Sequence, residues 1–351
     1  MRVLVTGGGG FIGSHCVDTL IARGHEVTVI DNFEPTVHAS APDYLNPSAT
    51  YVEADVADED ALMRALRGVD AVSHQAAVVG LGRGLVDAPR YARTNGVGTA
   101  VLLRCLAATG VRRLVLASSM VVYGEGAYRC AVHGPHRPGG RSEADLTAGR
   151  FDPRCSLCSL PLTPEPISED APLDPHSVYA ATKLHQEHLA FAAMRESGPA
   201  VTALRYHNTY GPRMPRDTPY AGVASLIRSQ IAAGGPPRVF EDGRQLRDFV
   251  HVRDVARANV LALERDGPAV GAYNIGSGES HTILELASAL TGALGGSAPI
   301  VTGEHRPSDV RHIFASSDKA KRDLGYRAEV SFERGIRDFA SAPLREPVAP
   351  G

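Results

Sequence analysis

The chain has 351 residues, and its 36 Lys and Arg residues against 39 Asp and Glu residues leave a formal net charge of −3 at pH 7. Apolar residues make up 43% and charged residues 21%, which is typical of a globular protein and excludes a disordered chain. The balanced charge gives no electrostatic signature of nucleic-acid or membrane-surface binding, and no run of about 18 apolar residues predicts a membrane span. Five cysteines are too few for a disulfide scaffold, so we expect a reduced, cytoplasmic protein.

A strand, a glycine-rich turn, a helix and a second strand open the chain. Residues 2–6 form a short apolar run, residues 14–23 carry apolar side chains at helical spacing, and residues 26–30 form another apolar run. The glycines allow the backbone to approach a pyrophosphate, and the helix N-terminus supplies free N–H groups. Two registers fit this dinucleotide-binding pattern, and they give the candidates Gly7 or Gly8, then Gly10, Phe11, Ile12 and Gly13.

An acidic residue closes the second strand of this unit. Asp31 lies 18 residues after Gly13, close to the spacing expected of a carboxylate that accepts hydrogen bonds from the adenosine ribose. Asn32 follows it, with no Arg or Lys beside the pair. NAD is therefore expected rather than NADP, because the carboxylate would repel a 2′-phosphate.

Further apolar runs at 69–73, 114–118 and 202–206 alternate with helical patterns such as 60–66 and 98–108. This alternation predicts an α/β fold of the Rossmann type, a doubly wound parallel sheet whose site lies beyond the carboxyl ends of its strands. Residues at such strand ends or helix starts are further cofactor candidates, with a solvated turn as the alternative for Asp55 and a helix cap as the alternative for Asn95. The candidates are Asp55, Val56, Gln75, Ala76, Ala77 and Asn95.

Three side chains form a candidate catalytic set. Ser119 follows the strand 114–118, and Tyr179 and Lys183 lie four residues apart on one face of a predicted helix. A nearby ammonium and a positive nicotinamide ring would lower the pKa of the Tyr179 phenol and make it a usable proton acceptor.

These motifs resemble those of the extended short-chain dehydrogenase/reductases, and among them the NAD-dependent epimerase/dehydratase family acting on nucleotide sugars. The resemblance covers nearly the whole chain. Its further carriers are Val122-Tyr123-Gly124, Arg205-Tyr206-His207-Asn208 and Arg247-Asp248-Phe249-Val250-His251-Val252.

The resemblance implies a transient oxidation of the sugar, usually at C4. Tyr179 would take the hydroxyl proton, Ser119 would hydrogen bond that oxygen, and Lys183 would hold the nicotinamide ribose. Tyr206 is implied as a further cofactor contact, and Asn208, Arg247 and Arg306 would grip the diphosphate of the substrate. Dimerisation is also implied, giving a homodimer.

Departures from the family pattern narrow the reaction. Dehydratases of the family carry an Asp-Glu pair after the strand-end Ser or Thr, and a decarboxylase is expected to carry an acid at the position of Val121. Here Met120 and Val121 occupy these positions, and neither transfers a proton. We therefore expect a nucleotide-sugar 4-epimerase, acting on a dTDP-sugar such as dTDP-L-rhamnose or on a UDP-hexose. The alternatives are a keto-sugar reductase using NAD(P)H and a non-catalytic NAD-binding scaffold.

Residues 125–168 form an insertion where the family usually has a short loop. It carries Cys130-x-x-His133 and Cys155-x-x-Cys158, a Cys₃His set typical of a closed structural Zn²⁺ site, with His136 as a reserve ligand. A loop with free thiols and a redox pair are the competing interpretations. Because the insertion follows the catalytic strand, we expect it near the sugar pocket.

The expected domain organisation has three parts. Residues 1–210 and 249–270 form the NAD-binding Rossmann domain, residues 125–168 the cysteine-containing insertion, and residues 211–248 and 271–351 a smaller nucleotide-sugar-binding domain.

Overall fold

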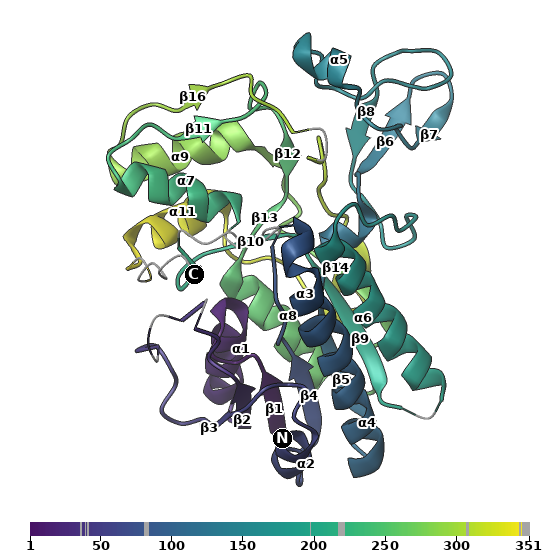
Figure 1. Ribbon diagram of the computed structural model, residues 1–351, viewed down its shortest axis with the longest axis vertical. Coiled ribbons are helices and arrows are strands. Elements are labelled where there is room, and N and C mark those ends of the chain that lie inside the picture. Colours follow the sequence, from purple (N-terminus) through teal and green to yellow (C-terminus); the bar gives the residue numbers. More distant parts are fainter. Residues whose placement is uncertain are drawn as a thin grey trace.

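A seven-stranded parallel sheet forms the larger part of the molecule (Figure 1). The computed structural model describes residues 1–35, 37–38, 40, 42–80, 84–196, 198–216, 222–306, 309–343 and 345. The sheet contains β1 (Arg2–Thr6), β2 (Glu26–Asp31), β3 (Thr50–Glu53), β4 (Ala71–His74), β5 (Arg113–Ser119), β9 (Ala200–Tyr206) and β14 (Gly271–Ile275). Its spatial order is β14-β9-β5-β4-β1-β2-β3.

Helices cover both faces of this sheet because the strands are apolar on both sides. In β1, Val3 and Val5 belong to one buried cluster and Leu4 to another, as the two-residue period of a strand requires. The first face packs against helices α1 (Phe11–Ala22) and α8 (Val252–Glu264). The second packs against α2 (Glu59–Ala65), α4 (Thr99–Thr109) and α6 (Val178–Arg195). The predicted doubly wound Rossmann fold is confirmed.

The strand order reverses at β1, which pairs with β2 on one side and with β4 on the other. The chain leaves β1 at Gly7 and leaves β4 at Gln75, so these two segments flank the crevice that such a reversal creates. Beyond β4 come η1 (Gly84–Asp87), α3 (Ala88–Tyr91) and the π-helical turn η2 (Ala92–Gly98), and η3 (Met120–Tyr123) follows β5.

A smaller unit stands beyond the carboxyl end of the sheet (Figure 1). Helices α7 (Val223–Ala232), α9 (Ile283–Leu294) and α11 (Phe332–Ser341) enclose its own core, which includes Ile227, Leu286 and Phe339. Its short strands pair as β10 (Asn208–Tyr210) with β13 (Phe249–His251), β11 (Arg238–Val239) with β16 (Ile300–Val301), and β12 (Leu246–Arg247) with β15 (His281–Thr282).

The expected domain boundary is wrong after residue 270. Gly271–Ile275 forms β14, an edge strand of the large sheet that pairs in parallel with β9. Helix α10 (Asp318–Leu324) also belongs to the larger unit, because its Ala320 and Leu324 lie in the core cluster of the large sheet. Both segments carry apolar side chains that complete this core, which a division at residue 270 overlooks.

The insertion folds as a three-stranded sheet, β7-β6-β8, with one short helix. Its elements are β6 (Ala127–Cys130), β7 (Gly134–His136), α5 (Glu143–Thr147) and β8 (Thr163–Glu165). Its own buried cluster consists of Tyr128, Cys130, Cys155 and Leu162, with Cys158 packed against them. Within the described part of the chain, no helix is long and apolar enough to cross a membrane.

Candidate active site

A cavity of about 400 Å³ lies at the reversal of the strand order and extends toward the smaller unit. It is lined by most of the residues that the sequence singled out for the cofactor and the reaction. These are Gly7, Gly10, Phe11, Ile12, Gly13, Asp31, Asn32, Asp55, Val56, Gln75, Ala76, Ala77, Ser119, Tyr179, Lys183, Tyr206 and Asn208. Asn95, Arg247 and Arg306 are not among the lining residues.

The glycine turn follows the register that begins at Gly7. Gly7 has a φ of 70°, and a Cβ built there would lie 2.6 Å from the backbone nitrogen of Ala76. A Cβ on Gly13 would lie 2.1 Å from the carbonyl oxygen of Gly7. Gly8 instead packs against the Val29 side chain. The turn therefore tolerates no side chains at these glycines, and it presents bare backbone of the kind that a dinucleotide pyrophosphate requires.

The carboxylate of Asp31 is fixed by two backbone donors at the end of β2. The N–H of Gly9 donates to it at 2.8 Å and the N–H of Phe33 at 2.9 Å. At the end of the next strand, Asp55 accepts a hydrogen bond from the Asn32 amide at 3.3 Å. These residues fit the adenosine end of NAD, as the sequence predicts.

Asn95 supports the cavity wall from behind. Its side chain accepts a hydrogen bond from the Val78 N–H and donates to the Val78 carbonyl, both at 2.9 Å, and it donates to Thr182 at 3.0 Å. The side chain is fully buried. In this structure Asn95 therefore ties the segment after β4 to α6, which differs from the direct cofactor contact predicted for it.

Buried polar groups also hold Gln75 at the cavity. Its amide donates to Asn259 at 2.9 Å, and its side-chain oxygen accepts from the Tyr206 hydroxyl at 3.2 Å. Asn259 donates in turn to Tyr206 at 2.8 Å. This network joins the ends of β4 and β9 and fixes the small residues after Gln75 against the glycine turn.

The three candidate catalytic side chains come together at one end of the cavity. Ser177 caps α6 by accepting from the Ala180 N–H at 3.1 Å, so the helix presents Tyr179 and Lys183 on one face. The Tyr179 and Ser119 hydroxyls share a hydrogen bond. The Lys183 ammonium donates to the Ala117 carbonyl at 2.9 Å, next to the end of β5.

The protein's own groups do not lower the pKa of Tyr179 overall. Burial raises it, and the hydrogen bond from Ser119 acts in the opposite direction. Burial lowers the pKa of Lys183 to about 7, against a smaller raising effect of Glu187. The expected lowering by Lys183 is therefore not provided by the chain alone, because the cost of burying a phenolate is larger.

A buried ion pair between Arg205 and Glu187 contacts the end of β5. Arg205 donates to Glu187 at 3.0 and 2.8 Å, and Glu187 also accepts a hydrogen bond from Ser118. Arg205 further donates to the Tyr123 hydroxyl at 2.9 Å. The carboxylate one helical turn after Lys183 thus orients the strand end that carries Ser119.

The three residues expected to bind the substrate diphosphate, Asn208, Arg247 and Arg306, do not lie together around one site. Asn208 faces the cavity, and its buried side-chain oxygen has no hydrogen-bond partner among the described residues. Arg247 donates to the carbonyls of Val310 at 2.5 Å and Arg311 at 3.0 Å. Arg306 is exposed and lies over the Phe240 ring at 5.1 Å. Of the three, only Asn208 lines the cavity.

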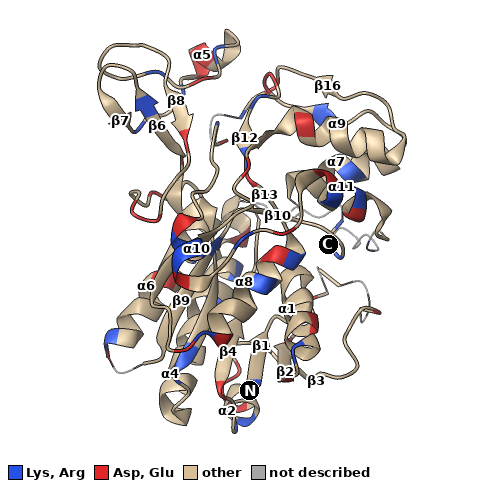
Figure 2. Ribbon diagram, turned by 180° about the vertical axis from the view of Figure 1, so that it is seen from behind, with Lys and Arg blue, Asp and Glu red and all other residues tan. Residues whose placement is uncertain are grey.

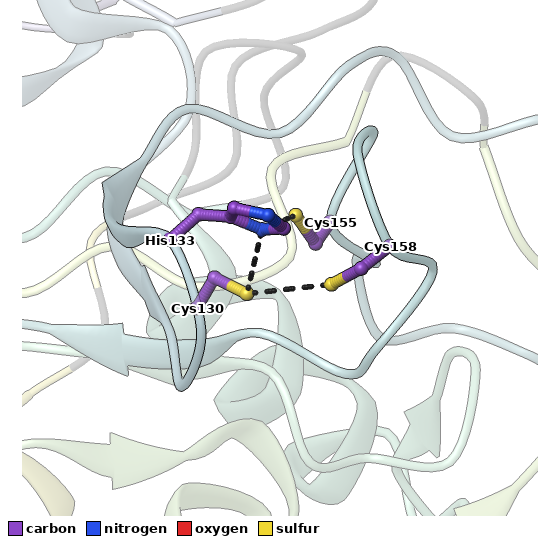
Figure 3. A group of neighbouring side chains, drawn as sticks. All are labelled: Cys130, His133, Cys155 and Cys158. Atoms are coloured by element: carbon purple, nitrogen blue, oxygen red, sulfur yellow. Dashed lines mark hydrogen bonds between the residues drawn. The ribbon is translucent and has the colours of Figure 1, made fainter.

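The predicted metal ligands gather in the insertion (Figure 3). The Cys130 sulfur lies 3.6 Å from Cys158 and 3.6 Å from His133 Nδ1, which lies 3.4 Å from Cys155. All four ligand atoms lie within 4.8 Å of one another. Zinc bonds of about 2.3 Å to sulfur and about 2.0 Å to nitrogen give tetrahedral edges of about 3.8 and 3.5 Å. The three pair distances of 3.4 to 3.6 Å match these edges.

Backbone N–H groups support this cluster. Those of His133 and Val132 lower the pKa of the Cys130 thiol to about 6. The reserve ligand His136 accepts from the Ser156 N–H at 3.2 Å through Nε2, so this nitrogen is engaged outside the cluster. None of the described residues lining the cavity belongs to the insertion, so the expected position beside the sugar pocket is not observed.

Sequence reasoning missed several cavity residues. His38, Arg90, Thr94, Met214 and Pro215 line the cavity but belong to no motif that the sequence reveals. Met214 and Pro215 follow Gly211-Pro212, the point at which the chain enters the smaller unit. Their only signal was this Pro- and Gly-rich transition, which marks a boundary but not a binding surface.

A parallel sheet of this order, a bare glycine turn at its reversal and a Ser, Tyr and Lys set beside the turn together define an extended short-chain dehydrogenase/reductase. The family model described as NAD dependent epimerase/dehydratase family matches residues 3–148 and 156–276. The chain belongs to the NAD-dependent epimerase/dehydratase family. The gap between the two matched segments falls inside the insertion.

Characterised relatives align over almost the whole chain. It is 36% identical to the dTDP-L-rhamnose 4-epimerase of Burkholderia thailandensis, covering 96% of this chain and 93% of the relative. It is 30% identical to the UDP-glucose 4-epimerase of Bacillus subtilis, covering 96% and 95%. The solved UDP-glucose 4-epimerase of Thermus thermophilus, in complex with NAD, aligns with a TM-score of 0.76 at 32% identity, covering 97% and 98%.

Proposed function

We propose that this protein is an NAD-dependent nucleotide-sugar 4-epimerase. The observation that carries the proposal is the meeting of Ser119, Tyr179 and Lys183 beside the glycine turn, with the apolar Met120 and Val121 at the positions that a dehydratase fills with acids. The set moves one proton to and from a sugar hydroxyl and lacks the extra acid–base pair that elimination needs.

The chain's residues control the proton at the C4 oxygen. Tyr179 takes the hydroxyl proton while Ser119 hydrogen bonds the same oxygen, and a carbonyl forms at C4. Lys183 stays anchored on the Ala117 carbonyl, one helical turn after Tyr179 on the same face of α6, where it would hold the nicotinamide ribose. Bound NAD would supply hydride transfer at C4, and its positive ring charge would favour the phenolate of Tyr179. Tyr179 returns the proton once C4 has been reduced on its opposite face.

The substrate class proposed is a nucleoside diphosphate sugar, with dTDP-deoxysugars tested first and UDP-hexoses second. The relative from Burkholderia thailandensis, a dTDP-L-rhamnose 4-epimerase, supports this order. Asn208 lines the cavity, and its buried side-chain oxygen, which has no hydrogen-bond partner among the described residues, leaves one acceptor for a donor group of the ligand. To bind the diphosphate, Arg247 would have to release the Val310 and Arg311 carbonyls, and Arg306 would have to leave the Phe240 ring.

The test is a panel of dTDP-, UDP- and GDP-sugars incubated with purified protein without added cofactor, with the C4 proton followed by NMR. A C4 epimer formed from one sugar supports the proposal and identifies the nucleotide. If no sugar changes but a keto-sugar is reduced when NAD(P)H is supplied, the protein is a reductase and the proposal is wrong.

We also propose that the insertion holds one structural Zn²⁺ through Cys130, His133, Cys155 and Cys158. Four protein ligands leave no open position for catalysis, and the small cluster around Tyr128 and Leu162 is too little to order 44 residues by itself. Metal analysis of protein purified without chelator is expected to give one zinc per chain. A chain that is folded and free of zinc contradicts this assignment.

The resemblance to the family also supports a homodimer, and free cysteines suit a reducing cytoplasm. Light scattering coupled to size-exclusion chromatography tests the proposed homodimer, and a monomer at micromolar concentration would refute it. Fractionation of the source cells tests the proposed cytoplasmic location.

A further inference from the structure

The insertion meets the smaller unit through a buried ion network centred on Arg311. The Arg311 side chain is fully buried, and it donates to Glu241 at 2.8 Å and to Asp242 at 2.7 and 2.9 Å in the smaller unit. It also donates to Asp152 of the insertion at 2.8 Å. Seen from both sides, the insertion stands next to β12 of the smaller unit (Figure 1 and Figure 2).

A second arginine crosses the same boundary from the insertion. Arg141 donates to Glu241 at 2.6 Å, with side-chain exposures of only 6% and 2%. Glu241 has a φ of 51°, a left-handed conformation that costs free energy for a residue other than glycine. The two arginines hold this strained residue, which indicates a joint that fixes geometry rather than an incidental surface contact.

The same segment leads from this joint to the substrate end of the cavity. Residues 309–313 lie against β12, where the Ile313 N–H donates to the Leu246 carbonyl at 3.0 Å. The Arg247 guanidinium donates to the carbonyls of Val310 and Arg311. On the insertion side, the His312 N–H donates to the Tyr128 hydroxyl at 3.2 Å.

From β12 the connection continues through the backbone. Asp248 follows Arg247, and its carbonyl accepts a hydrogen bond from the Asn208 N–H at 3.0 Å. Asn208 is the cavity residue with the partnerless buried oxygen. An unbroken series of contacts thus runs from Asp152 through Arg311 and Arg247 to Asn208.

We propose that Arg311 is a positioning residue for nucleotide-sugar binding, and that the insertion acts on the active site by holding it. The proposal rests on the proposed function for the identity of the ligand. Asp152 is the carboxylate through which the insertion pairs with Arg311. Without its negative charge, the 309–313 segment is held less firmly. The position of Arg247, and through Asp248 that of Asn208, then becomes less fixed. Substrate affinity then falls while the Ser119, Tyr179 and Lys183 set is untouched.

The test compares Asp152→Asn with Asp145→Asn. Asp152 is 60% exposed, so its amide variant is expected to fold. Asp145 is a matched control, because it pairs with Arg150 inside the insertion at 2.6 Å, and its side-chain contacts with the described residues stay within the insertion. Asp152→Glu, which restores the charge, is the rescue variant. Binding of dTDP and UDP is measured by calorimetry, with steady-state kinetics, zinc content and retained NAD measured in parallel.

Asp152→Asn is expected to weaken nucleoside diphosphate binding and raise KM by about threefold to fivefold, with kcat within about twofold. Zinc and NAD contents stay at wild-type values, as do all properties of Asp145→Asn, and Asp152→Glu recovers most of the affinity. Unchanged affinity in Asp152→Asn, or a loss confined to kcat, overturns the proposal.

Hydrogen exchange separates this proposal from the proposed function. Amides of 309–313 and of β12 are expected to exchange faster in Asp152→Asn than in wild type and Asp145→Asn. If no nucleotide binds even to the wild-type protein, the proposed function fails, but faster exchange still supports the positioning role. Equal exchange in all three proteins refutes it.

Discussion

Tyr179 is the side chain on which the proposed chemistry depends most directly. It is almost fully buried, it shares a hydrogen bond with Ser119, and its ring lies 5.9 Å from that of Tyr91. A phenylalanine fills the same volume but cannot carry the proton.

We expect Tyr179→Phe to lower kcat by a hundredfold or more, the range that a positioned acid–base group supplies, with NAD still bound. Turnover and the nucleotide content of the purified protein are measured together. Tyr51→Phe is the matched control, because the Tyr51 hydroxyl accepts from the Asn46 N–H in a surface loop. Near-normal turnover in Tyr179→Phe would remove it from its proposed role.

Lys183 predicts a pH dependence of stability. Burial lowers its pKa to about 7 in the folded protein, whereas in the unfolded chain its pKa keeps the ordinary lysine value of 10.5. Between about pH 7 and pH 10 the unfolded state therefore binds more protons, so this residue makes the free energy of unfolding rise with pH. Below pH 7 both states are protonated and the cost of burying the charge is fully present.

The comparison is between wild type and Lys183→Met, both stripped of bound nucleotide. We expect the melting temperature of wild type to increase relative to that of Lys183→Met as the pH rises from 7 to 9. From pH 6 to 6.5 the difference between the two melting temperatures should stay the same. A constant difference across the whole range would show that Lys183 is not buried as a titrating group.

Asp31 predicts the choice of cofactor. Because two backbone N–H groups hold its carboxylate in place, a 2′-phosphate meets a fixed negative charge. Affinity for NAD is expected to exceed that for NADP by at least about a hundredfold, and Asp31→Asn should narrow the ratio. Competition binding of the two nucleotides measures it, and preferential NADP binding by the wild-type chain would contradict the role of Asp31.

At the scale of an element, the insertion supplies two histidines close to its cysteines, and the structure distinguishes them. His133 Nδ1 lies 3.4 Å from Cys155 and 3.6 Å from Cys130, whereas His136 Nδ1 lies 3.9 Å from Cys155 and its other nitrogen bonds Ser156. His133 is therefore the fourth ligand of the proposed zinc site.

His133→Ala should lower the zinc content and the melting temperature of the insertion, while His136→Ala should keep one zinc per chain. A structural zinc contributes directly to folding, so metal loss and destabilisation are expected together. Elemental analysis and thermal unfolding provide the two readouts. Equal zinc loss in both variants, or in neither, would show that the ligand set is assigned wrongly.

At the scale of the whole molecule, local patterns predicted the parts of the fold that obey a local rule. The glycine turn, the alternation of strands and helices, and the four-residue spacing of Tyr179 and Lys183 each follow from backbone geometry over a few residues. The sequence likewise predicted the Cys-x-x-His and Cys-x-x-Cys pairs, which the structure brings together.

Contacts between distant segments left no such pattern. Arg311 and Asp152 are 159 residues apart, and neither stands in a motif. The resemblance to the family implied that Arg247 would bind the diphosphate, but in the fold its guanidinium donates to nearby backbone carbonyls. The edge strand β14 was assigned to the smaller unit because five residues after a break in the pattern do not reveal which sheet they join.

The central claim is that C4 is oxidised and then reduced within one active site. The most direct measurement uses the nucleotide sugar that the panel identifies, labelled with deuterium at C4, in ordinary water. Because the hydrogen leaves C4 as a hydride and not as an exchangeable proton, the account predicts that the epimer keeps its deuterium at C4. Replacement of this deuterium by solvent hydrogen would contradict the account and point to proton abstraction from carbon.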